Sequence, residues 1–325
     1  MDASLGTVAT PGNSFRARAE ARQREYRVEV LKAGWSKYGH HLDDDATRTG
    51  KNFVIPECYQ VAKSRAASGK GVAERTFINM LSSQAMCFNL FAPLTHDPHL
   101  ATKILQPFFP GLWLVRSIHF EYTPSNDIFG DQTGFGGVDC DLMLEAEWED
   151  EASAIITIET KFVEPEFSIC GFRKPGRKSK GQPVCPDDVR PAAGHEACLY
   201  TNRKHYRYWE QTQRLGTLCP ATLPDSGCPL AGPEWQLWVN HTLAHALADA
   251  GGGRHAVFAV CAPAGNKALL GDGVLERFHA RLARPESFRF IPLDGVLDAI
   301  DAATVGRAPE TREWFHGLRR RYARI

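Results

Sequence analysis

Three strand-like segments follow one another in the middle of the chain, and they constrain the fold more than any other feature. Residues 112–122 (LWLVRSIHFEY) are rich in β-branched and aromatic residues, residues 138–147 alternate apolar with mostly acidic positions, and residues 154–163 (AIITIETKFV) form a third run. The acidic stretch 148–153 separates the last two and reads as a turn. The sequence therefore predicts an antiparallel three-stranded meander at the centre of the protein.

Helical patterns surround this meander. Residues 74–94 carry apolar side chains at steps of three and four, which predicts one buried helix, and the continuous apolar run 255–262 (HAVFAVCA) predicts a further, buried strand. We expect an α/β fold with a central mixed sheet, the meander plus this further strand, flanked by helices. The other expected helices span residues 196–215, 234–250, 273–282, 293–302 and 310–322.

The length of 325 residues allows two domains or one large α/β domain with insertions. Residues 14–33 alternate Arg and Glu at helical spacing, so we expect residues 1–50 to form a helical arm with a solvated helix. Residues 51–325 are then a single domain. Residues 164–194, crowded with Pro, Gly, Lys and Arg, form a long loop insertion, and loops of this length are often functional.

Composition says more about the cellular compartment of the protein than about its binding partner. The chain has 38 basic and 38 acidic residues, so its net charge gives no argument for a polyanionic partner, and only local patches can. No apolar run reaches the length of a membrane helix, and the N-terminus lacks the order of a secretion signal. Nine cysteines, an odd number in a long chain, fit a reducing compartment. We expect a soluble, cytoplasmic protein with no membrane partner.

Acidic residues and one lysine mark the last two strands of the meander. Asp139 and Asp141 lie in one predicted strand, and Glu159-Thr160-Lys161 lies in the next. The two-residue period of a strand puts Glu159 and Lys161 on one face. Mg²⁺ takes oxygen ligands and needs only one or two protein carboxylates, so a metal site is expected here. Either aspartate can supply the first carboxylate, with Asp139 preferred because it follows a Gly-Gly turn.

At these residues the sequence resembles the PD-(D/E)xK nuclease superfamily, whose signature is an Asp on one strand and Glu-x-Lys on the neighbouring strand. Asp139, Glu159 and Lys161 match it, and the order of predicted helices and strands agrees. The segments SSQAMCFNLFAPL, HFEYTP, ETKFVE and EWQLWVNHTLAHAL resemble a bacterial subgroup of restriction-type nucleases, over roughly residues 74–300. The resemblance implies a restriction-endonuclease-like core.

The resemblance also implies a reaction, which is metal-dependent hydrolysis of DNA phosphodiester bonds in restriction, defence or DNA processing. Mg²⁺ or Mn²⁺ would be held by Asp139 and Glu159, with Asp141 as the other candidate, and Lys161 would serve in catalysis. Glu121 would add negative charge, and Gln84 and Glu164 would support the site. Gln84 stands where many members carry a Glu. A catalytically inactive nucleic-acid-binding protein and an RNA-directed nuclease are the alternatives, and a homodimer is compatible with double-strand cutting.

Basic residues in the long loop could contact phosphates, and solvated loop positions explain them equally well. They are Arg173, Lys174, Arg177, Lys178 and Lys180.

Cysteines gather in the same part of the chain and could hold a structural zinc ion or an iron–sulfur cluster. No Cys-x-x-Cys spacing occurs among them, so free thiols are the alternative. The residues considered as metal ligands are Cys170, Cys185, Cys198 and Cys219.

Overall fold

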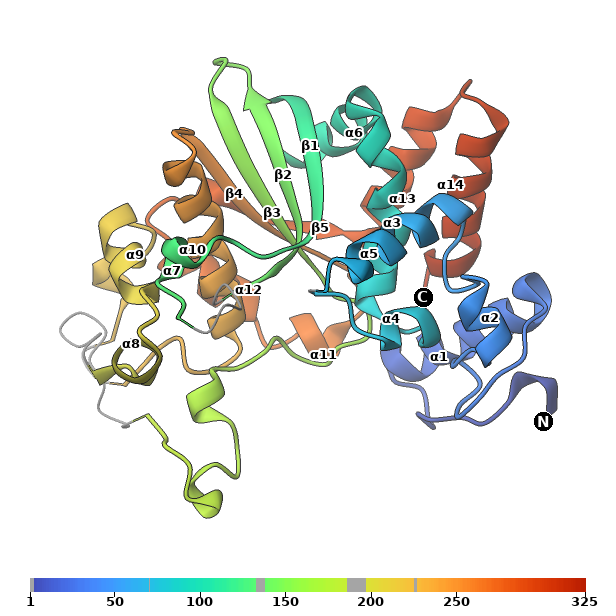
Figure 1. Cartoon of the computed structure of the whole chain (residues 1–325), viewed down its shortest axis with the longest axis horizontal. Coiled ribbons are helices and arrows are strands. Elements are labelled where there is room, and N and C mark those ends of the chain that lie inside the picture. Colours follow the sequence, from blue (N-terminus) through green and yellow to red (C-terminus); the bar gives the residue numbers. More distant parts are fainter. Residues whose placement is uncertain (1–2, 70, 133–137, 186–196, 225–226) are drawn as a thin grey trace.

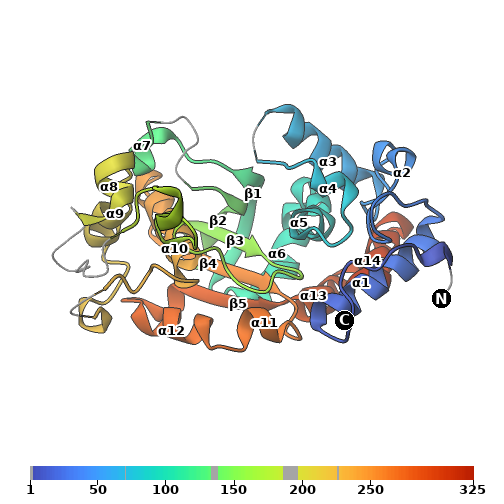
Figure 2. The ribbon, with the colours of Figure 1, turned by 90° about the horizontal axis from the view of Figure 1, so that it is seen from below.

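A computed structural model of the chain describes residues 3–69, 71–132, 138–185, 197–224 and 227–325. Its centre is a five-stranded sheet with the strand order β1-β2-β3-β4-β5 (Figure 1). The sheet lies between two groups of helices, as the view from below shows (Figure 2). In the part of the chain that the structure describes, no helix is both long and apolar enough to cross a bilayer.

The sheet is mixed, as predicted. Strands β1 (Leu112–Tyr122), β2 (Cys140–Trp148) and β3 (Ser153–Thr160) form the antiparallel meander. Strand β4 (His255–Ala262) pairs with β3 in parallel, after a long connection that contains helix α10 (Glu234–Ala250). The expected α/β fold is confirmed. A fifth strand, parallel to β4, was not predicted because it has only five residues, Phe288–Pro292.

Each face of the sheet packs against its own hydrophobic core. One core joins the sheet to α3, α5, α6, α13 and α14, and the other joins it to α9, α10 and α12. Helix α1 also contributes Phe15 and Ala19 to the first core. The helices besides α10 are α1 (Phe15–Tyr26), α2 (Asp44–Arg48), α3 (Pro56–Ala67), α4 (Arg75–Ile78), α5 (Ser83–Phe91), α6 (Pro98–Leu105), α7 (Asn126–Phe129), α8 (Leu199–Lys204), α9 (Tyr208–Leu215), α11 (Lys267–Leu270), α12 (Val274–Arg281), α13 (Leu293–Thr304) and α14 (Pro309–Tyr322).

The single helix expected over residues 74–94 is wrong, because the chain leaves the helical conformation between α4 and α5. Asn79 is extended and forms an isolated β-bridge with His41. Ser82 then starts α5, where its hydroxyl accepts a hydrogen bond from the Ala85 backbone N–H at 3.3 Å. A contact with a distant segment therefore sets this break.

The helix expected over residues 196–215 is also two helices. His205 adopts a left-handed backbone conformation, with φ of 60°, and ends α8. The Arg207 backbone N–H, which precedes α9, donates to the Phe129 carbonyl at 2.8 Å. Residue 196 itself lies outside the described residues.

The N-terminal helix α1 is not solvated as expected. It packs beside α14, and its polar residues Glu20, Gln23 and the following Arg27 are buried (Figure 1). Gln23 Nε2 donates to the Arg321 carbonyl at 3.1 Å, and Arg321 Nε donates to Gln23 Oε1 at 2.9 Å. The alternation of Arg and Glu in the sequence did not indicate this burial, because polar residues that pair in the interior give the same pattern as polar residues in solvent.

Candidate active site

The ends of β1, β2 and β3 bring the acidic residues of the meander together. The β1–β2 register pairs the residues on either side of Glu121 with those on either side of Asp141, so these two positions lie opposite each other. On the other side of β2, Leu142 pairs with Ile158, one residue before Glu159. Three carboxylates from three neighbouring strands therefore meet at one end of the sheet.

Asp141 is tied to the centre of the Glu-Thr-Lys segment. Its Oδ2 accepts hydrogen bonds from the Thr160 backbone N–H at 2.7 Å and from the Thr160 hydroxyl at 2.6 Å. Burial and then the neighbouring Glu159 raise the pKa of Asp141 to about 7, against the opposing effects of Thr160 and Lys161. Sequence reasoning missed Thr160, because its contact follows from the pairing of the strands.

Glu159 and Lys161 form a buried ion pair on one face, as the strand period predicts. Lys161 Nζ lies 2.9 Å from Glu159 Oε1, and the two side chains are 10% and 7% exposed. Burial lowers the pKa of Lys161, but Glu159 and Asp141 together outweigh it and raise the pKa above its ordinary value. Lys161 is therefore a charged ammonium group held beside two carboxylates.

Two amides of helix α10 fix the Glu159 carboxylate. Gln236 Nε2 donates to Oε1 at 2.7 Å, and Asn240 Nδ2 donates to Oε2 at 2.9 Å. The two residues are four apart on a helix, so they share one face. An amide i, i+4 pair within the largely buried helix EWQLWVNHTLAHAL is the signal in the sequence that could have found them.

Glu121 sits in a strained and buried position at the end of β1. Its φ is 48°, in the left-handed region, and its backbone carbonyl accepts from Arg65 Nη2 at 2.6 Å. Among the described residues, its Oε1 is buried without a hydrogen-bond partner. Burial, and then Asp141, raise the pKa of Glu121 to about 9, although a hydrogen bond from Gln84 acts in the opposite direction.

Gln84 and Glu164 both lie around this cluster and serve mainly to hold backbone. Gln84 Oε1 accepts from the Ala73 N–H at 3.0 Å and from the Thr76 hydroxyl. Glu164 Oε2 accepts from the Phe162 N–H at 2.7 Å, directly after Lys161. The structure thus places both predicted supporting residues beside the site.

Asp139 lies outside the strand that carries Asp141, because β2 begins at Cys140, whereas the sequence predicted both aspartates in one strand. Asp139 is exposed. It lines a cavity of about 350 Å³ together with Gln236 and Asn240, the two residues whose side-chain amides donate to Glu159. The two aspartates therefore lie in different surroundings.

A sequence model of the PD-(D/E)XK nuclease superfamily matches residues 11–179 and 195–324, nearly the whole chain. The chain belongs to this superfamily. Neither the curated proteins nor the solved structures contain a match. Membership places the chain among nucleases, which typically use a divalent metal, and confirms the resemblance at the level of the superfamily; the restriction-type subgroup stays a prediction.

The five basic residues predicted to contact phosphates, within positions 173–180, lie in a segment that projects from the body of the protein (Figure 1, yellow-green). Arg173 Nη1 donates to the Cys185 carbonyl at 3.0 Å and Arg177 Nε donates to the Pro183 carbonyl at 2.8 Å, so both arginines hold the loop. Lys174, Lys178 and Lys180 are exposed. The loop is not structureless, since it contains two single-turn 3-10 helices, and its residues 186–194 lie outside the described residues.

The four cysteines that lie together in the structure are not the same four that were predicted as metal ligands. Cys170, Cys185, Cys198 and Cys228 line one apolar cavity of about 20 Å³, whereas Cys219 does not line it. A hydrogen bond from Cys170 lowers the pKa of Cys185 to about 6 and raises that of Cys170. All nine thiols are free. Within the described ranges, no three His, Cys, Asp or Glu side chains form an arrangement ready to hold a metal ion.

Proposed function

We propose that the protein is a metal-dependent nuclease that hydrolyses DNA phosphodiester bonds at the end of β1, β2 and β3. The observation that carries the proposal is the buried Lys161–Glu159 pair beside Asp141 and Glu121, in a chain that belongs to a nuclease superfamily. An ammonium group among carboxylates suits phosphoryl chemistry, in which most of the catalysis is electrostatic.

The donor groups of the cluster fit a hard divalent cation. Glu121 Oε1 lacks a hydrogen-bond partner among the described residues, and Asp141 uses only Oδ2 to accept from Thr160. The pKa values of about 9 and about 7 show that ionisation of these buried, neighbouring carboxyl groups is costly, and a bound cation would offset that cost. Mg²⁺ needs only one or two protein carboxylates, with water completing its octahedron.

In this proposal Asp141 and Glu159 would hold Mg²⁺ or Mn²⁺, and Glu121 would bring a third negative charge close to the ion. The bound ion would polarise the phosphodiester and lower the pKa of a water molecule. Thr160 holds Asp141, and the Gln236 and Asn240 amides hold Glu159, so the carboxylates keep their orientation. Lys161 orients the attacking water and neutralises the charge that develops on the phosphate.

Asp141 takes the place that we had expected for Asp139. Asp141 bonds to the strand that carries Glu159 and Lys161, whereas Asp139 precedes β2 and is exposed. A short side chain fixed by two hydrogen bonds is better suited to position a cation than an exposed one. Asp139 stays a candidate for a contact with substrate or water at the cavity that it lines.

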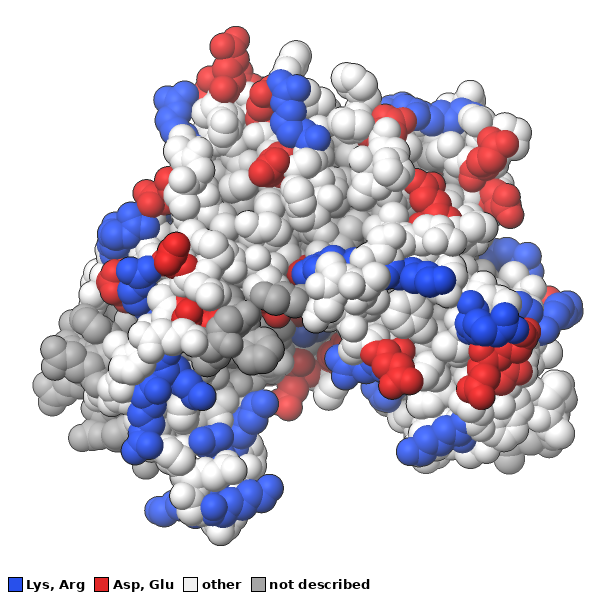
Figure 3. Space-filling view, in the orientation of Figure 1, with Lys and Arg blue, Asp and Glu red and all other residues white. Residues whose placement is uncertain are grey.

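The surface around the site has the shape and charge for a large polyanion. A hollow separates the projecting loop from the part of the molecule that carries α1 and α4, and Lys and Arg side chains gather on the loop (Figure 3). The exposed Lys174, Lys178 and Lys180 can contact phosphates without reading a sequence.

One observation favours the second candidate, a nucleic-acid-binding protein without turnover. Gln84 stands where many members carry a helix glutamate, and its Oε1 already accepts from Ala73 and Thr76. The neutral amide of Gln84 cannot supply the negative charge of that missing carboxylate. Glu121 would have to supply this charge, so the two functions differ in whether Glu121 ionises when metal binds.

Incubation of the purified protein with supercoiled plasmid tests the proposal. We expect nicking with Mg²⁺ or Mn²⁺ that EDTA abolishes, and a loss of about 100-fold or more in Lys161→Ala and Glu159→Gln. Lys103→Ala, at an exposed position on α6, should leave the rate unchanged. Salt-dependent binding of intact plasmid without cleavage would favour the second candidate, and cleavage of RNA alone would correct the substrate.

A further inference from the structure

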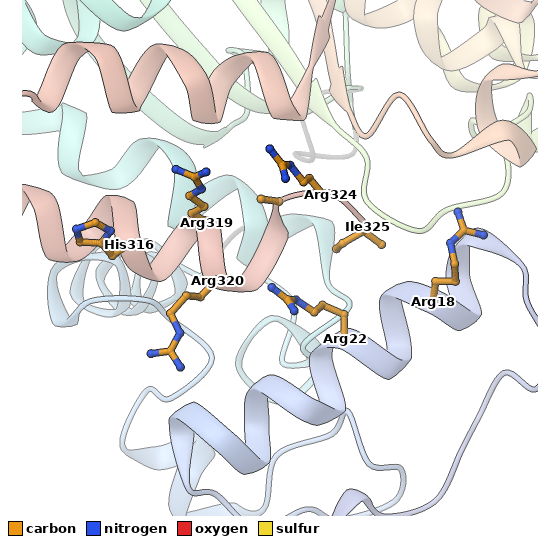
Figure 4. A pocket seen from close by; sticks show the side chains of 8 residues that line it. Arg18, Arg22, His316, Arg319, Arg320, Arg324 and Ile325 are labelled. Atoms are coloured by element: carbon orange, nitrogen blue, oxygen red, sulfur yellow. The ribbon is translucent and has the colours of Figure 1, made fainter.

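A second basic feature lies away from the carboxylate cluster, between the first and the last long helix. A cavity of about 770 Å³ is lined by residues of α1 and by the end of α14 and the residues that follow it (Figure 4). Arg18 and Arg22 come from α1, and the other basic residues come from α14 and the residues that follow it. We call this feature the arginine pocket; its basic side chains are Arg18, Arg22, His316, Arg319, Arg320 and Arg324.

The arginine pocket is strongly positive because little compensates its charge. No Asp or Glu side chain lines it. Arg319 lies 4.0 Å from Asp301, and both side chains are about half exposed, so this pair contributes little. Among the described residues, no carboxylate lies within ion-pairing distance of the guanidinium groups of Arg22, Arg320 or Arg324. Such an accumulation of like charge is relieved by binding an anion.

Helix α14, which forms one side of the arginine pocket, packs against the segment that directly follows Lys161. Phe162, the residue after Lys161, packs its ring edge-on against Tyr322, the last residue of α14, with ring centres 5.5 Å apart. Asn266 Nδ2 donates to the Phe162 carbonyl at 3.2 Å and to the Glu164 carbonyl at 2.9 Å. A Cβ at the adjacent Gly265 would lie 3.3 Å from the Ile325 carbonyl oxygen, so one lining residue of the pocket lies close to the segment that Asn266 holds after Lys161.

We propose that the arginine pocket binds the sugar–phosphate backbone of the nucleic acid whose phosphodiester bond is hydrolysed at Lys161. This inference rests on the proposed function and adds to it a second contact surface for the substrate. Arg18 and Arg22 are four residues apart on α1, so they share one face. Arg320 lies on α14, whereas Arg324 follows the end of that helix and has a left-handed backbone, with φ of 55°. The basic side chains are spread along the pocket and point in different directions (Figure 4). Guanidinium groups spread over such a length suit an extended chain of phosphates better than one compact anion.

The lining of the arginine pocket also indicates backbone rather than base recognition. It contains no Phe, Tyr or Trp on which a base could stack, and its apolar members are Ala323 and Ile325. Guanidinium groups that contact only phosphates position a nucleic acid without reading its sequence. The expected contribution is therefore independent of sequence and sensitive to salt.

Binding measured without cleavage tests the inference. In a Lys161→Ala background and in EDTA, the affinity for a fluorescent DNA duplex is measured by anisotropy between about 50 and 200 mM salt. We expect Arg22→Gln/Arg320→Gln to weaken binding about tenfold and to reduce the slope of log affinity against log salt by about 2. Arg48→Gln/Arg312→Gln, with the same change of charge at exposed positions outside the pocket, should behave as the parent.

The outcomes separate this inference from the proposed function. If the wild-type chain cleaves DNA but both double variants bind alike, the arginine pocket is not a substrate surface and the nuclease stands. If DNA is never cleaved but binding falls only in Arg22→Gln/Arg320→Gln, the surface stands and the nuclease fails. If inorganic tripolyphosphate raises the Tm of the parent but not of this variant, while DNA affinity is the same in both, the pocket takes a small anion and the inference is overturned.

Discussion

Glu121 is the residue whose surroundings differ most from those of an ordinary strand position. It is 5% exposed, has a positive φ, and faces Asp141 across the β1–β2 pair. Strained, buried and acidic positions are costly, and such positions concentrate at functional sites. The sequence predicted the acid itself but not the strain, because the backbone conformation depends on Arg65, which holds the Glu121 carbonyl from another element.

The raised pKa of Glu121 predicts how stability depends on pH. The folded chain keeps this proton up to pH about 9, whereas the unfolded chain releases it near its ordinary value of 4.5. Because the folded state binds more protons in between, the metal-free protein loses stability as pH rises through that window. Glu121→Gln should reduce this loss, measured as Tm in EDTA at about pH 5 and about pH 8.5, where 1 kcal/mol corresponds to about 2–4 °C.

Glu149→Gln, at an exposed position, provides the control and should show the pH dependence of the wild type. An equal fall of Tm in Glu121→Gln and in the wild type would contradict the account of Glu121 as a carboxyl group that stays protonated in the metal-free protein.

Gly71 predicts a second effect at Glu121. A Cβ at Gly71 would lie 2.6 Å from the Glu121 Cβ, closer than packing allows, whereas a Cβ at Gly69 meets nothing within 4 Å. Both glycines have a positive φ, 85° and 83°, so an alanine strains the backbone equally at either. Gly71→Ala should lower the cleavage rate by about 100-fold through displacement of Glu121.

Gly69→Ala carries the same strain without the clash, so it should cleave DNA at nearly the wild-type rate. Comparable activity in the two variants would show that the position of Glu121 does not matter for the reaction.

At the scale of elements, sequence patterns were most successful where burial alone decides the structure. Strands β1 and β4 and helix α10 begin and end at the predicted residues. Strand β4 and helix α10 are largely buried, and β1 is partly buried, so the pattern of apolar residues was enough to find them. The breaks within residues 74–94 and 196–215 could not be predicted, because Asn79 and Arg207 take their hydrogen bonds from distant segments. The partners of Glu159 are 77 and 81 positions away, which is equally beyond a local pattern.

The packing of α14 onto the N-terminal segment predicts a large effect of one buried arginine. Arg321 is fully buried, and it donates to Gln23 Oε1 at 2.9 Å, to the Asn52 carbonyl at 2.5 Å and to the Met80 carbonyl at 3.2 Å. Arg321→Ala leaves these acceptors without donors and opens a cavity, so unfolding free energy should fall by about 3 kcal/mol or more.

The neighbouring Arg320 is exposed, and Arg320→Ala should change the unfolding free energy by less than about 0.5 kcal/mol. Denaturant titration of the two variants checks the difference. Similar stabilities would mean that α14 does not depend on the buried arginine, contrary to the contacts described above.

At the scale of the whole molecule, the candidate site lies between two basic surfaces that the sequence places far apart. The projecting loop carries Lys174, Lys178 and Lys180, and the arginine pocket joins α1 to α14 near both ends of the sequence. The net charge of zero conceals both, since Asp and Glu side chains, which are spread over the same face, balance the Lys and Arg side chains (Figure 3). Local composition predicted the loop, whereas the pocket required knowledge of which helices pack together.

The loop predicts a contribution to affinity that is separate from catalysis. Replacing Lys174, Lys178 and Lys180 with Gln should reduce the salt dependence of DNA binding by up to about 3 in slope while leaving Tm unchanged. Replacing Lys37, Lys63 and Lys103 with Gln removes the same number of positive charges at exposed positions outside the loop, and this triple variant is the control. Equal slopes for the two triple variants would assign the loop to solvent rather than to the substrate.

In the proposed function Asp141 forms a metal-dependent hydrolytic site with Glu159 and Lys161. The initial rate of cleavage of one labelled duplex in Mg²⁺ tests this assignment. We predict that Asp141→Asn lowers this rate by about 100-fold or more, because the bound cation loses a fixed carboxylate. Asp139→Asn, at an exposed position, should leave most of this rate in place. An inactive Asp139→Asn beside an active Asp141→Asn, both with wild-type Tm, would contradict the account.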